Sequence, residues 1–199
     1  ECIAAAKAVY AHDFIMRLPN GYNTVMPCQR AHRNRDEKFT SMGYYERYDV
    51  ISWINYILSM DPEAEIVLLG ISMGSATVML TTGEVLPKNV KCCIADCGFS
   101  DCYQLFKEMI TVETGLPVFP FLQAANSFAS LFLGWNFKDC APIEAVSVSE
   151  TPTLFIHGED DKLVPFWMME ALYESCNAPK EKLAVPEAGH DEACSNAPD

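Results

Sequence analysis

Apolar residues along this chain follow two spacings in turn, and the alternation predicts strands separated by helices. Short apolar runs at 66–69, 90–95 and 153–157 are typical of buried strands, and 183–185 predicts a last short one. Apolar positions at helical spacing predict helices at residues 2–17, 44–60, 72–81, 166–175 and within 103–134. After a Pro-Asn-Gly break, one further strand is expected at Tyr22 to Met26.

Strands that alternate with helices form βαβ units, so the pattern predicts an α/β fold with a mostly parallel sheet and flanking helices. We expect a single domain over residues 1–199. Residues 101–146 interrupt this alternation of strands and helices, because they are rich in Phe, Leu, Pro and Trp. This helical insertion either forms a lid over the strand ends or packs on one sheet face, and composition leaves both open. As a lid it would offer Phe119, Phe121 and Trp135 as substrate-pocket residues.

Composition limits the classes of molecule that this protein is expected to bind. Half of the 199 residues are hydrophobic and 21% are charged, which is typical of a globular protein. The formal net charge of −13 disfavours nucleic acid and anionic membrane surfaces, since both carry phosphate. No apolar run approaches 18 residues, so no membrane span is expected. The nine cysteines include no CxxC pair, which favours reduced thiols in a cytoplasmic protein without a metal site.

The segment "EIVLLGISMGSATVML" carries the most specific chemical signal. An apolar strand leads into Gly-Ile-Ser-Met-Gly, and a helix-forming segment follows. A nucleophile elbow requires this context, in which a sharp turn exposes the hydroxyl of Ser72 and the small residues Gly70 and Gly74 permit close backbone approach. The start of the following helix supplies N–H groups for developing negative charge. The pattern therefore predicts Ser72 as an activated nucleophile.

An activated serine needs a base, and the chain has four histidines. Two precede Ser72, and His157 closes an apolar strand, where it is most simply a strand-end residue. His190 lies in a loop after the last predicted strand, where sheet enzymes that order their triad as nucleophile, acid and base place the base. For the acid, spacing leaves open the three carboxylates of "HGEDDKLVP" and a rival on the preceding strand: Glu159, Asp160, Asp161 and Asp96.

Several motifs together resemble the α/β-hydrolase superfamily: "GISMGSAT", "HGEDDKLVP" and "EAGH". "QRAH", "MGYYERYDV" and "PIEAV" further resemble its serine-aminopeptidase-like and esterase branch, which is common in Firmicutes. This resemblance implies Ser72 as nucleophile, Asp161 as acid and His190 as base. It also implies one oxyanion donor at the backbone N–H of Met73, and hydrolysis of esters, thioesters or peptides without a cofactor or metal.

The ends of the sequence depart from that superfamily. The N-terminal strands and the His-Gly-type loop that donates the second oxyanion N–H find no counterpart, and neither does the last helix. A chain that starts with Glu1 and stops shortly after His190 is expected to be truncated at both ends. Neighbouring strands lie about 4.8 Å apart, so a missing central strand would leave unpaired backbone unless an oligomer or a partner chain completes the sheet.

The sequence thus predicts a serine hydrolase that cleaves a carboxylic ester or thioester of a small, apolar substrate, with peptidase activity as a further option. Substrate identity lies in the site and not in the fold. The alternative is a catalytically weak or inactive hydrolase-like module that needs a missing segment or a partner chain.

Overall fold

The computed structural model describes residues 24–31, 39–115 and 117–196. Its centre is a parallel sheet of four strands in the order β1-β2-β3-β4. These strands span Ile66–Ile71, Val90–Asp96, Thr153–Gly158 and Lys180–Val185. The sequence predicts all four, although β4 begins three residues earlier than its apolar run, because its first residues are charged and half-buried or exposed. The α/β fold with a parallel sheet is confirmed.

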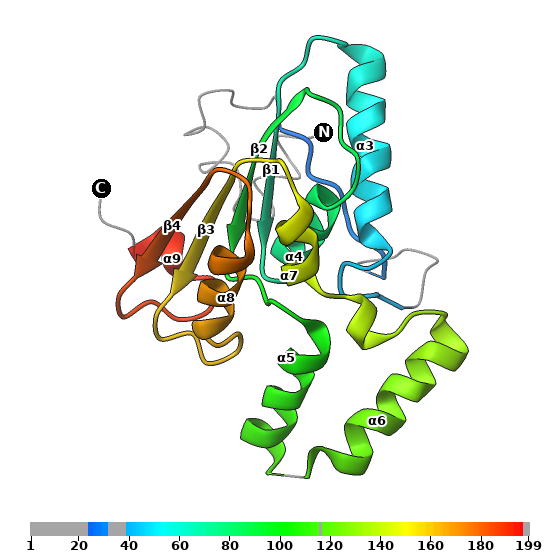
Figure 1. Ribbon diagram of the computed structural model, residues 1–199, viewed down its shortest axis with the longest axis vertical. Coiled ribbons are helices and arrows are strands. Elements are labelled where there is room, and N and C mark those ends of the chain that lie inside the picture. Colours follow the sequence, from blue (N-terminus) through cyan, green and yellow to red (C-terminus); the bar gives the residue numbers. More distant parts are fainter. Residues whose placement is uncertain (1–23, 32–38, 116, 197–199) are drawn as a thin grey trace, which may run out of the picture.

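Helices cover one side of this sheet, as Figure 1 shows. They are α3 (Glu46–Met60), α4 (Met73–Thr82), α7 (Pro142–Val148) and α8 (Trp167–Ser175). Helix α4 is the central one, because it packs on β1, β2, α3 and α7 and its residues Ser75–Thr82 are all buried. The short helix α9 (Ala193–Asn196) lies on the other side, where Ala193 clusters with Val185 and Ile156.

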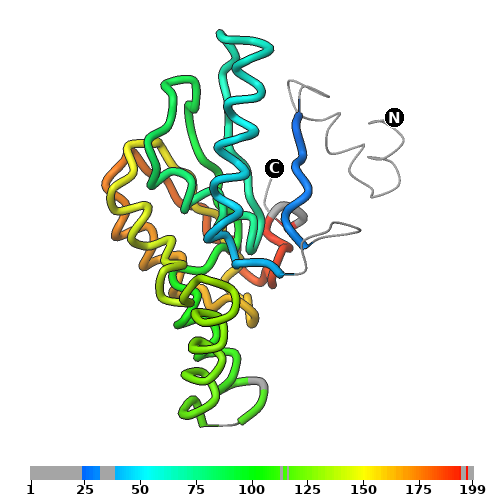
Figure 2. Tube along the Cα trace, turned by 90° about the vertical axis from the view of Figure 1, so that its right-hand side faces the viewer, coloured from blue at the N-terminus to red at the C-terminus, as the bar shows by residue number. Residues whose placement is uncertain are grey.

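The helical excursion leaves the body at the carboxyl edge of the sheet (Figures 1 and 2). It consists of α5 (Cys102–Met109), the π-helical segment η1 (Ile110–Thr114), α6 (Val118–Phe128), the π-helical segment η2 (Ala129–Leu133) and the 3-10 turn η3 (Phe137–Asp139). Its base is fixed by the backbone N–H of Cys102, which donates to the carbonyl of Cys140 at 2.9 Å. Trp135 packs there in the same core cluster as Leu105 and Val164. A role for this insertion as a lid stays a prediction.

One face of β1 is exposed in the part of the chain that the structure describes. Ile66 and Leu68 are buried against α3 and α4, whereas Val67, Leu69 and Ile71 are 54%, 47% and 43% exposed. Strand β1 pairs with β2 on one side and is the edge of the described sheet. That a strand of the superfamily's sheet is missing next to β1 stays a prediction.

Two predicted elements are missing from the described structure, the strand at 22–26 and the helix at 2–17. Residues 24–26 of the expected strand Tyr22 to Met26 form no strand, and they are exposed. The rest of that strand and the predicted helix at 2–17 lie outside the described residues. Val25 and Met26 are apolar but 46% and 64% exposed, so their apolar character alone did not indicate a strand.

Candidate active site

Ser72 stands in a sharp turn between β1 and α4. Its backbone has φ 54° and ψ −118°, a conformation that residues with a side chain rarely adopt. Strain of this kind costs on the order of 1–3 kcal/mol and persists only where the surroundings enforce it. Here the N–H of Ser72 donates to the carbonyl of Asp96 at 2.9 Å, which fixes the turn to the end of β2. The local geometry is that of a nucleophile elbow.

The two glycines of the motif have different roles in this turn. A Cβ added to Gly70 would lie 2.2 Å from the carbonyl oxygen of Gly74, so only glycine fits there. A Cβ added to Gly74 would have as its nearest neighbour the Nε2 atom of Gln29, at 3.9 Å. The close approach thus depends on the missing side chain at Gly70, and Gly74 contributes its backbone.

Three side chains from distant parts of the sequence form a continuous hydrogen-bonded chain. Nε2 of His190 lies 2.9 Å from Oγ of Ser72. Nδ1 of His190 lies 2.7 Å from Oδ2 of Asp161. With Nδ1 donating to the carboxylate, Nε2 is left to accept the proton of the serine hydroxyl. The structure therefore brings together all three residues that the sequence indicates.

Backbone contacts between two loops hold His190 opposite Asp161. The N–H of Asp160 donates to the carbonyl of Ala188 at 3.0 Å. A Cβ on Gly158 would lie 2.2 Å from that same carbonyl oxygen, so the loops meet at a glycine. The carboxylate of Glu192 closes the second loop by accepting from the N–H of Gly189 at 2.9 Å. The histidine loop is thus positioned by the loop that carries the acid.

The carboxylate of Asp161 accepts several hydrogen bonds. Its side chain is fully buried, and Oδ1 accepts the backbone N–H groups of Leu163 and Val164, both at 2.9 Å. Burial by itself would raise the pKa of this carboxyl, but the hydrogen bonds from His157, His190 and Val164 outweigh it and lower the pKa to about 2. Asp161 is therefore ionised at neutral pH and can stabilise an imidazolium at His190.

His157 is a second neighbour of this carboxylate, and the sequence reasoning missed that role. The residue is completely buried, with Nε2 at 2.9 Å from the carbonyl of Val164 and 3.2 Å from Oδ2 of Asp161. A carbonyl can only accept, so Nε2 carries the hydrogen, and Nδ1 has no hydrogen-bond partner in the part of the chain that is described. The sequence feature that could have indicated this role is the position of His157 near the end of a buried strand, four residues before Asp161.

The rival candidates occupy different environments. Glu159 and Asp160 are exposed, whereas Asp96 is buried at the end of β2. The thiol of Cys97 lies beside the elbow, where burial and then the charge of Asp96 raise its pKa to about 12. That thiol is protonated at neutral pH and is a poor nucleophile. Among these groups, Asp161 is the carboxylate that contacts His190.

Met73 is the first residue of α4. Its backbone N–H is one of those that a helix leaves without an intrahelical acceptor, and the helix dipole favours negative charge at this end. Oγ1 of Thr40 lies 3.5 Å from the sulfur of Met73 and 3.1 Å from Oε1 of the buried Glu46, to which it donates its single hydrogen. The start of α4 can therefore receive an oxyanion that forms next to Ser72.

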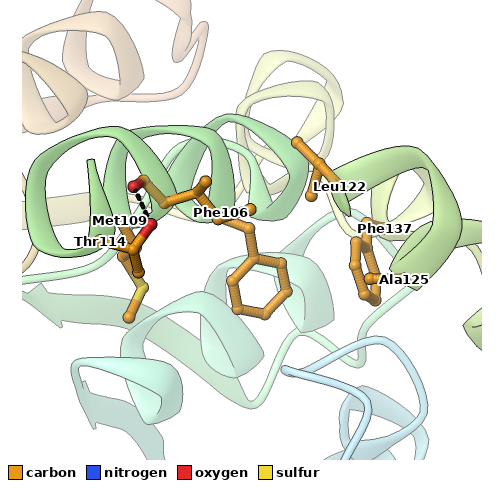
Figure 3. Close-up of a pocket in the computed structure, with 7 residues that line it drawn as sticks. Phe106, Met109, Thr114, Leu122, Ala125 and Phe137 are labelled. Carbon is orange, nitrogen blue, oxygen red and sulfur yellow. Dashed lines mark hydrogen bonds between the residues drawn. The ribbon is translucent and has the colours of Figure 1, made fainter. Parts of the chain in front are cut away.

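The three expected pocket residues differ in their exposure. Phe119 and Phe121 are 72% and 50% exposed, whereas Trp135 is 5% exposed and belongs to the core. The difference arises because an aromatic-rich segment does not reveal which ring faces inward. A cavity of about 320 Å³ does lie in the excursion (Figure 3), and it is lined by Phe106, Met109, Ile110, Thr114, Leu122, Ala125 and Phe137.

No metal or membrane feature accompanies these residues in the described ranges. No group of three or more His, Cys, Asp or Glu side chains there is arranged to hold a metal ion. None of the described helices combines the length and the apolar character that crossing a bilayer requires.

Comparison with known proteins agrees with this geometry. The family model described as the prolyl oligopeptidase family matches residues 9–195. The chain belongs to this family. The prolyl oligopeptidase family lies within the α/β-hydrolase superfamily, so the superfamily expected from the motifs is confirmed.

The sequence identity to individual relatives is low. This member of the prolyl oligopeptidase family is 30% identical to the uncharacterized protein YqkD of Bacillus subtilis over 181 residues, which cover 90% of this chain and 58% of that protein. It is 25% identical to the uncharacterized protein YfhR of Escherichia coli K12, over 73% of this chain and 45% of that protein. The chain thus spans about half the length of these curated relatives.

Solved structures show the same fold. The Pyrococcus furiosus esterase Pf2001 has a TM-score of 0.63 at 22% identity, over 85% of this chain and 63% of that one. A Pyrococcus horikoshii acylaminoacyl peptidase has a TM-score of 0.59 at 16% identity, over 78% of this chain and 25% of that one. At these identities the likeness establishes the fold alone, and the chain covers only part of each of these two structures.

Proposed function

We propose that this chain is a serine hydrolase that cleaves a carboxylic ester or thioester of a small, apolar substrate. The observation that carries the proposal is the unbroken hydrogen-bonded chain from Ser72 through His190 to Asp161. Its starting point is a strained turn at a helix N-terminus, where the backbone N–H of Met73 directly follows Ser72. Membership of the prolyl oligopeptidase family supports hydrolytic chemistry.

The proposed mechanism is acyl transfer to water. Nε2 of His190 removes the proton of Ser72 as Oγ attacks the carbonyl carbon, and the oxyanion that forms accepts the N–H of Met73. The protonated imidazole then gives its proton to the leaving alcohol or thiol, and the acyl group remains on Ser72. A water molecule, deprotonated by His190, releases the acid and restores the serine. Asp161 holds the imidazole in place and stabilises its positive charge in both halves.

Labelling with a fluorophosphonate probe tests this function most directly. We expect one adduct on Ser72, located by peptide mapping, and loss of the adduct in Ser72→Ala and in His190→Ala. A panel of esters, thioesters and peptides then assigns the reaction class. A folded chain that reacts with none of these substrates and forms no adduct would contradict the proposal.

A second candidate is a hydrolase-like module that depends on further polypeptide. The observation that favours it is the exposed apolar face of β1, where Val67, Leu69 and Ile71 are all more than 40% accessible. Exposed apolar patches of this kind are typical of surfaces that further polypeptide covers. Gel filtration with light scattering distinguishes the two: a monomer that turns over substrate excludes the partner-dependent candidate.

A further inference from the structure

A buried carboxylate that the proposed mechanism does not use lies at the start of α3. Glu46 is the first residue of that helix and is 1% exposed. Its carboxylate accepts the backbone N–H groups of Ser41 and Gly43, both at 2.9 Å. It also accepts the hydroxyl of Thr40, at 3.1 Å, and that of Ser41. All of these donors belong to residues 40–43, which we call the entry loop.

The entry loop and the Glu46 carboxylate fix each other. Among the described residues this carboxylate takes part in no ion pair, so its hydrogen bonds there come from neutral donors. Burial by itself would raise the pKa of Glu46, but the hydrogen bonds, first those from Ser41, outweigh it and lower the pKa. Glu46 is therefore ionised at neutral pH. A buried anion of this kind is destabilised by the loss of any of its donors.

The entry loop packs along one face of α4. Met73, Thr77 and Leu80 share that face, because residues four and three positions apart lie above one another on a helix. Oγ1 of Thr40 lies 3.5 Å from the sulfur of Met73. A Cβ added to Gly43, whose φ is 109°, would lie 3.2 Å from Cα of Thr77 and 3.1 Å from a methyl carbon of Leu80. The loop thus contacts the first turns of α4, and its close approach requires a glycine.

The same face of α4 carries the donor that the proposed mechanism assigns to the oxyanion. The backbone N–H of Met73 directly follows Ser72, and the carbonyl of Met73 accepts the hydroxyl of Thr77 at 2.8 Å. The two residues that the entry loop contacts first are therefore linked to each other. Displacement of a catalytic group by about 1 Å can lower a rate by about 10²-fold. Support for these turns therefore affects the geometry beside Ser72.

We propose that Glu46 is a positioning residue of the hydrolase, which holds the first turns of α4 through the entry loop so that the N–H of Met73 points at the oxyanion. This assignment rests on the proposed hydrolase function and adds a residue outside the triad. Glu46 acts through the loop and not by contact with the substrate.

The first test measures kcat and KM for p-nitrophenyl acetate, with the reactive serine titrated by the fluorophosphonate probe. Glu46→Gln replaces the anion by an amide, and Ser41→Ala removes one donor to it. We expect kcat per titrated site to fall by about 10- to 100-fold in Glu46→Gln, and by a smaller factor in Ser41→Ala. KM should stay unchanged, because the oxyanion contact forms only in the transition state.

Ile54→Ala is the matched control. Ile54 lies on the same helix as Glu46 and is 2% exposed, but it packs in the core cluster of β1 and not on the entry loop. This variant should lower stability and keep the wild-type kcat per titrated site. Wild-type kcat per site in Glu46→Gln, or in Ser41→Ala if Glu46→Gln does not fold, would overturn the positioning role and leave the hydrolase function intact. An equal loss in Ile54→Ala would overturn it as well.

A second measurement is independent of turnover. The chain has nine methionines, and in protein labelled with ¹⁵N-methionine the backbone amide resonance of Met73 is identified by its loss in Met73→Leu. We expect this resonance to shift in Glu46→Gln and Ser41→Ala and to keep its position in Ile54→Ala. A resonance that stays in place in the first two variants, or shifts equally in all three, would overturn the proposal. A wild type without adduct or hydrolysis would contradict the proposed function, and the Met73 resonance would still decide the role of Glu46.

Discussion

The carboxyl edge of the sheet and the helical excursion are built in opposite ways. At the edge, the Asp161 carboxylate is fully buried, and two backbone N–H groups and two histidines surround it. In the excursion, large apolar side chains are exposed, among them Leu131 at 78% and Phe132 at 67%. The comparison indicates that the geometry around Ser72 is fixed by directional contacts, whereas the excursion is held by a small apolar base.

This difference predicts where substitutions have large effects. Hydrogen bonds to a buried charge specify one arrangement, because each lost partner leaves an unsatisfied group behind. Exposed apolar side chains contribute little to the free energy of unfolding, so they can change without loss of the fold. Substitutions at the edge should therefore impair catalysis or folding, and those on the outer surface of the excursion should do neither.

The largest expected effect is that of Asp161→Asn. The amide would retain the size of the side chain but remove the charge that holds His190 in the tautomer needed to accept the serine proton. We expect kcat for ester hydrolysis to fall by about 10⁴-fold. The control is Asp160→Asn at the exposed neighbouring position, which should keep wild-type kcat. Similar rates in the two variants would contradict the role assigned to Asp161.

Gly70→Ala tests the turn itself. Its Cβ would lie 2.2 Å from the carbonyl oxygen of Gly74, and backbone must move to admit it. We expect the free energy of unfolding to decrease by roughly 3 kcal/mol in urea denaturation. Gly74→Ala is the matched control, since its Cβ meets nothing closer than 3.9 Å, and it should change stability by no more than about 1 kcal/mol. Equal losses would contradict the asymmetry of the two glycines.

His157→Phe tests the hydrogen bond from His157 to the carboxylate of Asp161. A lost hydrogen bond to a charged group is worth roughly 1.5–3 kcal/mol, so kcat/KM should decrease by about 10- to 100-fold. His157→Gln can still donate through its amide and should recover part of the loss. Active-site titration with the fluorophosphonate probe separates a slower enzyme from a smaller folded fraction. An unchanged kcat per titrated site would show that His157 acts on stability alone.

The smallest effect is expected on the outer surface of the excursion. Leu131→Ser removes an apolar side chain that is 78% exposed, and we expect the free energy of unfolding to change by less than about 0.5 kcal/mol. Leu122→Ser, in the same excursion but 1% exposed, is the contrast and should destabilise by several kcal/mol. Thermal denaturation measures both. A large loss for Leu131→Ser would mean that further polypeptide covers this surface.

The sequence by itself determined the order of elements and the candidate chemistry. Local periodicity placed β1, α4, β2, β3 and α8 within a few residues, because strand and helix spacing are properties of neighbouring residues. Gly-x-Ser-x-Gly after a buried strand identified Ser72, since the turn it needs is also local. For the acid, spacing left several carboxylates open until the family resemblance indicated Asp161.

Only the tertiary structure decided which distant groups meet. The contacts of Asp161 with His190, and of His157 with the same carboxylate, join the ends of β3 and β4, and no local pattern encodes such a distance. The inward and outward directions of the rings in the excursion were likewise undetermined: of the three rings expected together at a pocket, Phe119 and Phe121 are exposed and Trp135 is buried. Packing between helices sets these directions, because an aromatic-rich segment can bury any of its faces.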